Sequence, residues 1–215
     1  MAILTTGPTT AYAAGSGSNP TNLGCWCWTQ YCSTKDHHFL LFSIYCPNHN
    51  VIGQLSVYAQ HQRYFQDTDN DRDPIHAFFE DLATAIADWQ ALGDLVIVCG
   101  DINHDVLHPT ITNYFHQLGL HNLIFSHHNP SNAPATYARN QNNISIDDIW
   151  GPSFLLYHSK VGYLDFNIFL GDHHALWFDL IMTNFLDIHY HLHEAPQFAT
   201  FNCVTPDACD GITRS

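Results

Sequence analysis

The chain has 215 residues, of which 46% are hydrophobic and only 12% are charged, so it has enough apolar side chains to build a folded core. Twenty acidic residues against six basic ones give a formal net charge of −14 with histidine neutral. The apolar content therefore excludes a disordered chain. The negative field repels polyanions unless cations intervene, which argues against tight metal-free binding of nucleic acid.

No apolar run approaches the roughly 18 to 20 residues that a membrane span needs, and the longest ones, 39–45 and 95–99, have the length of strands. The first ten residues contain no basic residue, and their apolar part stops after Leu4, unlike a secretory signal. These features predict an intracellular protein with no membrane partner.

The first part of the chain predicts strands. Residues 1–6 read as a strand, and the small residues and turn formers of 7–20 read as a loop to the next one. The runs 25–31 and 38–45 predict two consecutive strands. The second run is apolar enough to indicate burial on both faces in a central sheet.

A helix and a buried strand follow. Asp73 can cap a helix and Pro74 suits its first turn, after which apolar residues recur every three or four positions until Gly93. The apolar run LVIVCGD then predicts a buried strand that places Asp101 at its carboxyl end, where ligand sites are common. Further candidates are a helix at 112–118, strands at 135–137, 146–150, 154–157 and 175–182, and a weakly ordered tail at 183–215.

Acidic, amide and imidazole side chains fall near three of these strands. Asp101 and Asn103 follow one strand, Asp147 lies in SIDDIW, and the pair Asp172 and His173 precedes the last strand. Carboxylate and amide oxygens suit a hard cation, and a carboxylate-held imidazole can stabilise charge on a phosphate. Taken singly, each also fits a turn cap or a solvated loop.

Taken together, GDIN, IDDIW and GDHHALW, in this order and after SIYCPNHN, resemble the motifs of the endonuclease/exonuclease/phosphatase superfamily, whose members include DNase I-like and AP-endonuclease-like proteins. The resemblance covers residues 1–182. It implies an α/β fold, a DNase I-like sandwich of two mainly antiparallel β-sheets flanked by helices, here truncated at the amino terminus. GCWCWTQY and GDHHALWFDL are most similar to endonuclease domains of retroelements.

The resemblance also implies roles for particular residues. Asp101 would orient or deprotonate the attacking water, and Asp147 would organise the site. Asp172 would bind metal or hold the imidazole of His173, which would stabilise charge on the phosphate. The implied metal ligands, for Mg²⁺ or Mn²⁺, are Asp101, Asn103 and Asp172, and the implied phosphate-binding residues are Tyr45, Asn48, Asn103 and His173. The implied activity is magnesium-dependent hydrolysis of a phosphodiester, as an endonuclease on DNA rather than RNA, or of a small phosphoester.

Two other interpretations stay open. In the resembling family a glutamate before the matching segment is the principal metal ligand, whereas this chain has only Glu80 and Glu194. On the first interpretation, the chain is a catalytically disabled, retroelement-derived remnant without enzyme activity. Separately, HYHLH places His189, His191 and His193 on one face of an extended strand, a spacing that suits zinc or copper.

Overall fold

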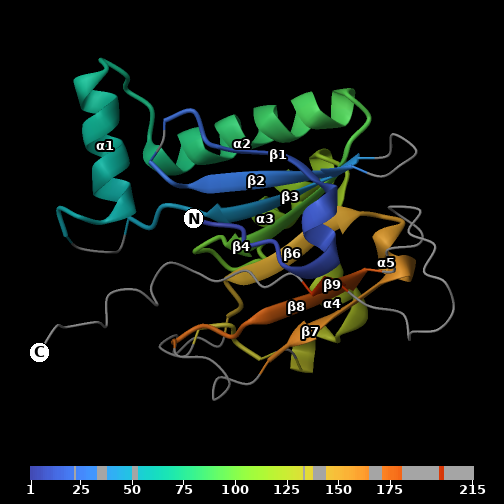
Figure 1. Ribbon diagram of the computed structural model, residues 1–215. Helices are drawn as coiled ribbons and strands as arrows, with labels where there is room; N and C mark the ends of the chain where they lie inside the picture. Colours follow the sequence, from blue (N-terminus) through green and yellow to red (C-terminus); the bar gives the residue numbers. More distant parts are fainter. Residues whose placement is uncertain are drawn as a thin grey trace, which may run out of the picture.

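The computed structural model describes residues 1–21, 23–32, 38–49, 53–132, 134–137, 144–164, 171–180 and 199–200 (Figure 1). These residues form two β-sheets with helices around them. The strands are β1 (Ala13–Ser18), β2 (Trp26–Cys32), β3 (His38–Tyr45), β4 (Leu95–Asp101), β5 (Leu120–Asn122), β6 (Asp147–Pro152), β7 (Ser159–Tyr163), β8 (Leu176–Leu180) and β9 (Ala199–Thr200). The helices are α1 (Val57–Asp67), α2 (Pro74–Ala91), α3 (Pro109–Gln117), α4 (Leu123–His127) and α5 (Leu155–His158), with 3₁₀ turns η1 (Gly7–Tyr12) and η2 (Pro130–Asn132).

The larger sheet has the strand order β1-β2-β3-β4-β6-β5, and the smaller sheet has the order β7-β8-β9. Strands β3 and β4 are parallel, whereas the other neighbouring strands are antiparallel. In Figure 1 the smaller sheet lies below the larger one. The predicted α/β sandwich of two mainly antiparallel sheets is therefore confirmed.

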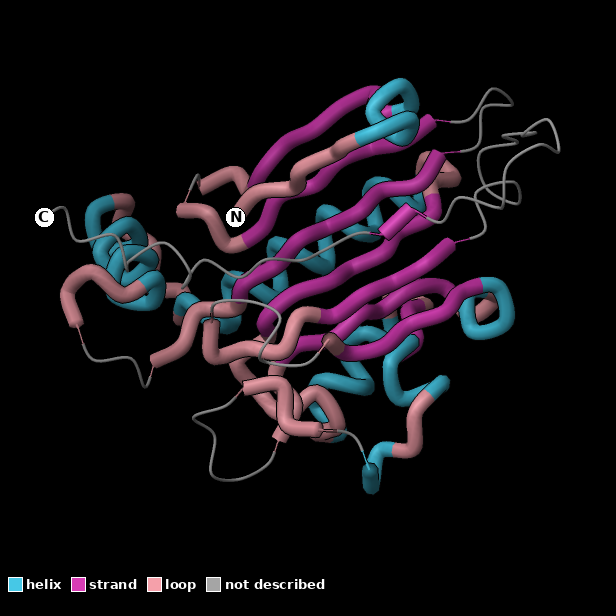
Figure 2. The backbone as a smooth tube through the Cα atoms, turned by 60° about the horizontal axis from the view of Figure 1, so that its bottom comes forward, coloured by secondary structure: helices cyan, strands magenta, loops and turns pink. Residues whose placement is uncertain are grey.

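The central strands β3 and β4 of the larger sheet are buried on both faces, as their apolar runs predict. Residues Leu40, Phe42 and Ile44 point to the side of α2 and α3 and form one core with them. Phe39 and Leu41, which alternate with those three, point to the smaller sheet and form a second core. Figure 2 shows α2 lying behind the strands of the larger sheet and running along them.

The expected helix after Asp73 is present as α2. The Asp73 side chain accepts hydrogen bonds from the N–H groups of Ile75 and His76, and Pro74 occupies the first turn, where its missing N–H costs nothing. Leu82 and Ile86 from this helix are fully buried against the larger sheet. No described helix is long and apolar enough to span a membrane.

Several local predictions were wrong. Residues 1–6 pair with no described strand, and the predicted loop at 7–20 contains η1 and the edge strand β1. The expected strand at 154–157 is the short helix α5, because a run of four apolar residues fits a buried helical turn as well as a strand. Segment 135–137 contributes only a single bridge, between Tyr137 and His173.

The division into a domain at 1–182 and a tail at 183–215 stays a prediction. Two residues of the expected tail, Ala199–Thr200, form β9 and pair with β8. His189, His191 and His193, the residues of the zinc or copper interpretation, lie outside the described part of the chain.

Candidate active site

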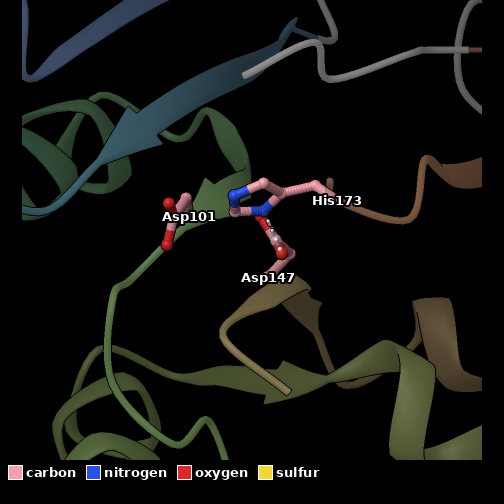
Figure 3. A group of neighbouring side chains, drawn as sticks. All are labelled: Asp101, Asp147 and His173. Atoms are coloured by element: carbon pink, nitrogen blue, oxygen red, sulfur yellow. Dashed lines mark hydrogen bonds and ion pairs between the residues drawn. The ribbon is translucent and has the colours of Figure 1, made fainter. Parts of the chain in front are cut away.

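Asp101, Asp147 and His173 come together at one end of the larger sheet, and Figure 3 shows their side chains pointing toward one another. Each offers one metal-ligating atom, and these three atoms all lie within 4.8 Å of one another. Asp101 ends β4 and Asp147 begins β6, and the antiparallel register places these two residues directly opposite. His173 is brought in from the segment before β8 through its bridge with Tyr137.

His173 and Asp147 form a hydrogen-bonded ion pair. The distance from His173 Nδ1 to Asp147 Oδ2 is 2.8 Å, and the two side chains are only 11% and 5% exposed. Burial by itself disfavours the charged imidazolium, but the hydrogen bond to Asp147 and the charges of Asp147, Asp101 and Asp172 outweigh it. Together they raise the pKa of His173 to about 9, so His173 is cationic at neutral pH.

This raised pKa makes the stability of the protein depend on pH. Below the ordinary histidine pKa of 6.5 the ion pair contributes fully. As pH rises toward about 9, the unfolded chain has already lost the proton that the folded chain still holds, so the contribution is lost. We expect wild type to lose about 3 kcal/mol more than His173→Gln between pH 6 and pH 10 in urea unfolding. Parallel pH profiles for the two proteins would contradict the pairing.

Asn103 is attached to the same site by its backbone and its side chain. Its N–H donates to Asp101 Oδ1 at 2.7 Å, and its φ of 53° is left-handed, a conformation that asparagine tolerates better than most residues. Its Nδ2 donates to the carbonyl of Cys46 at 2.7 Å, while its Oδ1 accepts from Asn48 Nδ2 at 3.1 Å. These bonds fix the Asp101 carboxylate and join Asn48 to the site.

Gly100 allows β4 to approach β3 where the site begins. Its φ is +143°, and a Cβ built at this position would lie 2.0 Å from the carbonyl oxygen of Ile44. No other residue fits such a close contact between backbones. The glycine of the GDIN motif is therefore required for β4 to deliver Asp101 beside Tyr45, its partner in the parallel register.

Two further predicted site residues, Tyr45 and Asp172, are neighbours of Asp101 and His173. Tyr45 is half-buried at the end of β3, and Asp172 is half-buried next to His173, to whose raised pKa its charge contributes. Asp172 is not one of the three residues of the ligand group found in the described part of the chain. The assignments of Asp172 and Asn103 to a metal, and of Tyr45 and Asn48 to a phosphate, stay predictions.

The residues present fit a divalent cation held through carboxylates. Magnesium prefers oxygen ligands, commonly one or two carboxylates with water and substrate phosphates completing the shell. Asp101 and Asp147 supply such carboxylates, whereas His173 is protonated at neutral pH and bonds Asp147 through Nδ1. Glu80 is on α2, where its carboxylate is 3.6 Å from Arg72, and Glu194 lies outside the described residues.

Sequence reasoning missed Thr136 and Tyr137, which contact this site from the segment 134–137. Thr136 is fully buried, and the ring of Tyr137 lies 4.8 Å from that of His173, centroid to centroid. The strand prediction at 135–137 was the only available signal. The sequence of residues 135–137 does not indicate that they contact the site, because this contact depends on pairing with His173.

A sandwich of two sheets with helices around them, and with this acidic and histidine-containing group at the end of the larger sheet, is a DNase I-like fold. The 3′-5′ exonuclease from Neisseria meningitidis shares this fold. Its TM-score with the chain is 0.53 at 14% sequence identity, over 78% of this chain and 71% of the exonuclease.

Two further structures are less similar. The catalytic domain of Xenopus laevis APE2 has a TM-score of 0.47 at 16% identity, over 71% of this chain and 54% of its own. The endonuclease domain of TRAS1, a telomere-specific non-LTR retrotransposon, also has a TM-score of 0.47 at 16% identity, over 77% and 68%. The chain spans about half to two thirds of the length of several such proteins. No protein-family model and no curated protein matches the sequence.

Proposed function

We propose that this protein hydrolyses phosphodiester bonds with a divalent cation, Mg²⁺ or Mn²⁺, and that it acts as an endonuclease on DNA. The observation that carries the proposal is the convergence of Asp101, Asp147 and His173, whose side-chain oxygen and nitrogen atoms lie within 4.8 Å of one another. It is supported by the shared fold with a 3′-5′ exonuclease. The preference for DNA rests on the resemblance of the sequence to retroelement endonucleases.

The cation supplies positive charge to a phosphate that the net charge of −14 would otherwise repel. Asp101 is assigned to orient the attacking water and accept its proton, as a carboxylate held in place by the Asn103 N–H can do. The second hydrogen on Asn103 Nδ2 is assigned to a phosphate oxygen, because the first donates to the Cys46 carbonyl. Tyr45 and Asn48 are assigned to the same phosphate.

His173 is assigned to stabilise the charge that develops on the phosphate oxygens. It is cationic at neutral pH, and Asp147 holds its imidazole in one orientation through the 2.8 Å hydrogen bond. A fixed cation in a site that is largely shielded from water is worth more than the same charge in solution. This arrangement stabilises a negative transition state without further movement of the side chain.

The direct test is nicking of supercoiled DNA with Mg²⁺ or with Mn²⁺. We expect EDTA to abolish the activity, and Asp101→Ala and His173→Ala each to lower the rate by about 100-fold or more. Asp88→Asn is the matched control, because Asp88 is an exposed carboxylate on α2, and its activity should equal that of wild type.

The outcomes separate the two interpretations of the sequence. Activity that persists unchanged in both site variants would exclude the assigned residues. Absence of metal-dependent hydrolysis of DNA, RNA and a small aryl phosphodiester would favour the catalytically disabled remnant. Hydrolysis of the small ester alone would move the substrate from nucleic acid to a small phosphoester.

A further inference from the structure

Thr136 connects the two halves of the His173 and Asp147 pair. Its Oγ1 accepts hydrogen bonds from the N–H groups of Ile146, at 2.9 Å, and of Asp147, at 3.0 Å. Its carbonyl oxygen accepts from the N–H of His174 at 2.7 Å. One fully buried residue thus bonds the backbone of Asp147 on one side and the backbone next to His173 on the other.

The neighbouring residue strengthens this connection. Tyr137 forms an antiparallel bridge with His173, and their rings are inclined by 40° with centroids 4.8 Å apart. The two-residue segment 136–137 therefore lies against 173–174 and also contacts the start of β6.

The connection matters because Asp147 and His173 belong to different parts of the fold. Asp147 begins a strand of the larger sheet, whereas His173 precedes β8 of the smaller sheet. Their hydrogen bond of 2.8 Å persists only if the two sheets keep their separation at this point. Displacements of about 1 Å at a catalytic group can lower rates by about 100-fold.

We propose that Thr136 is a positioning residue that sets the distance between Asp147 and His173 and so holds the site in its active geometry. Its effect on catalysis rests on the function proposed above, whereas its effect on geometry does not. The hydroxyl is essential to the proposal because it supplies the acceptor for two N–H groups that are buried at residues 146 and 147.

The test compares Thr136→Val, which keeps the shape of the side chain but removes the acceptor, with Thr136→Ser, which keeps the hydroxyl. Thr29→Val is the matched control, since Thr29 is a buried threonine on β2. Three quantities are measured for each protein: kcat and KM on DNA, the affinity for Mn²⁺ alone, and amide hydrogen exchange at Asp147 and His174.

For Thr136→Val we expect kcat and Mn²⁺ affinity each to fall about tenfold or more, with little change in KM and faster exchange at both amides. Thr136→Ser should stay within about threefold of wild type, and Thr29→Val should match wild type in all three measurements. Equal losses in Thr136→Val and Thr136→Ser would overturn the proposal, as would a Thr136→Val protein with wild-type kcat, Mn²⁺ affinity and exchange.

Two further outcomes are decided by the same measurements. If wild type hydrolyses no substrate, the proposed function fails, but Mn²⁺ affinity and exchange at Asp147 and His174 still decide the positioning role. If Thr136→Val does not fold, amide exchange in the wild type decides the positioning role. Its Ile146 and Asp147 amides must then be protected from exchange, and rapid exchange at both would overturn the proposal.

Discussion

Replacing Asp147 by asparagine is expected to lower the rate of DNA hydrolysis by about 100-fold or more. The substitution keeps the size of the side chain but removes the charge that pairs with His173 at 2.8 Å. The pKa of His173 should then fall from about 9 toward its ordinary value, so that the imidazole loses its proton near neutral pH. The measurements are kcat at saturating DNA and the pKa of His173 by NMR.

The matched control is Asp148→Asn, one residue further along β6. Asp148 is fully buried, and burial raises the pKa of its carboxyl well above the usual range. Its carboxyl accepts from Asn122 and from the backbone of Ile149 rather than from His173. The His173 pKa should be unchanged in this variant. If Asp147→Asn and Asp148→Asn lower kcat equally, the effect is one of folding, and the assigned role of Asp147 is wrong.

Replacing Gly100 by alanine is expected to destabilise the protein by about 2–4 kcal/mol and to abolish hydrolysis. The added methyl group would lie 2.0 Å from the Ile44 carbonyl oxygen, and the φ of +143° is strained for any residue with a Cβ. To relieve the contact, β3 and β4 must separate where they deliver Tyr45 and Asp101. Chemical denaturation measures the stability, and the nicking assay measures the activity.

The control for this prediction is Gly119→Ala, which also introduces a Cβ at a positive φ. Gly119 has a φ of +71° after α3, and a Cβ there would have no neighbour within 4 Å. Its cost should be about 1 kcal/mol, from backbone strain alone, with activity retained. Equal stability losses in the two variants would mean that the approach of β4 to Ile44 is not tight.

The central strands and the longest helix could be predicted from the sequence because their signals are local. β3 and β4 are continuous apolar runs that the fold buries on both faces. α2 begins at a capping aspartate followed by proline, and its apolar residues recur at the helical period. Each of these features depends only on residues a few positions apart, so no knowledge of tertiary contacts is needed.

Short segments could not be predicted in this way. Residues 154–157 are apolar enough for a strand, but Leu155–His158 form α5, because one helical turn buries Leu155 in the second core and leaves Tyr157 exposed. Residues 13–18 are small and read as a loop, yet they form β1 because β2 offers an edge with which to pair. In both segments the neighbouring elements decided the secondary structure.

The sequence by itself determined which acidic, amide and imidazole side chains are candidates for a site, and it placed Asp101 at the end of a buried strand. Only the tertiary structure decided that Asp101 faces Asp147, that Asp147 bonds His173, and that Thr136 joins the two. The physical reason is that strand register and the packing of one sheet on the other bring together residues that are far apart in the chain. Such contacts form through the fold as a whole, and no short stretch of sequence encodes them.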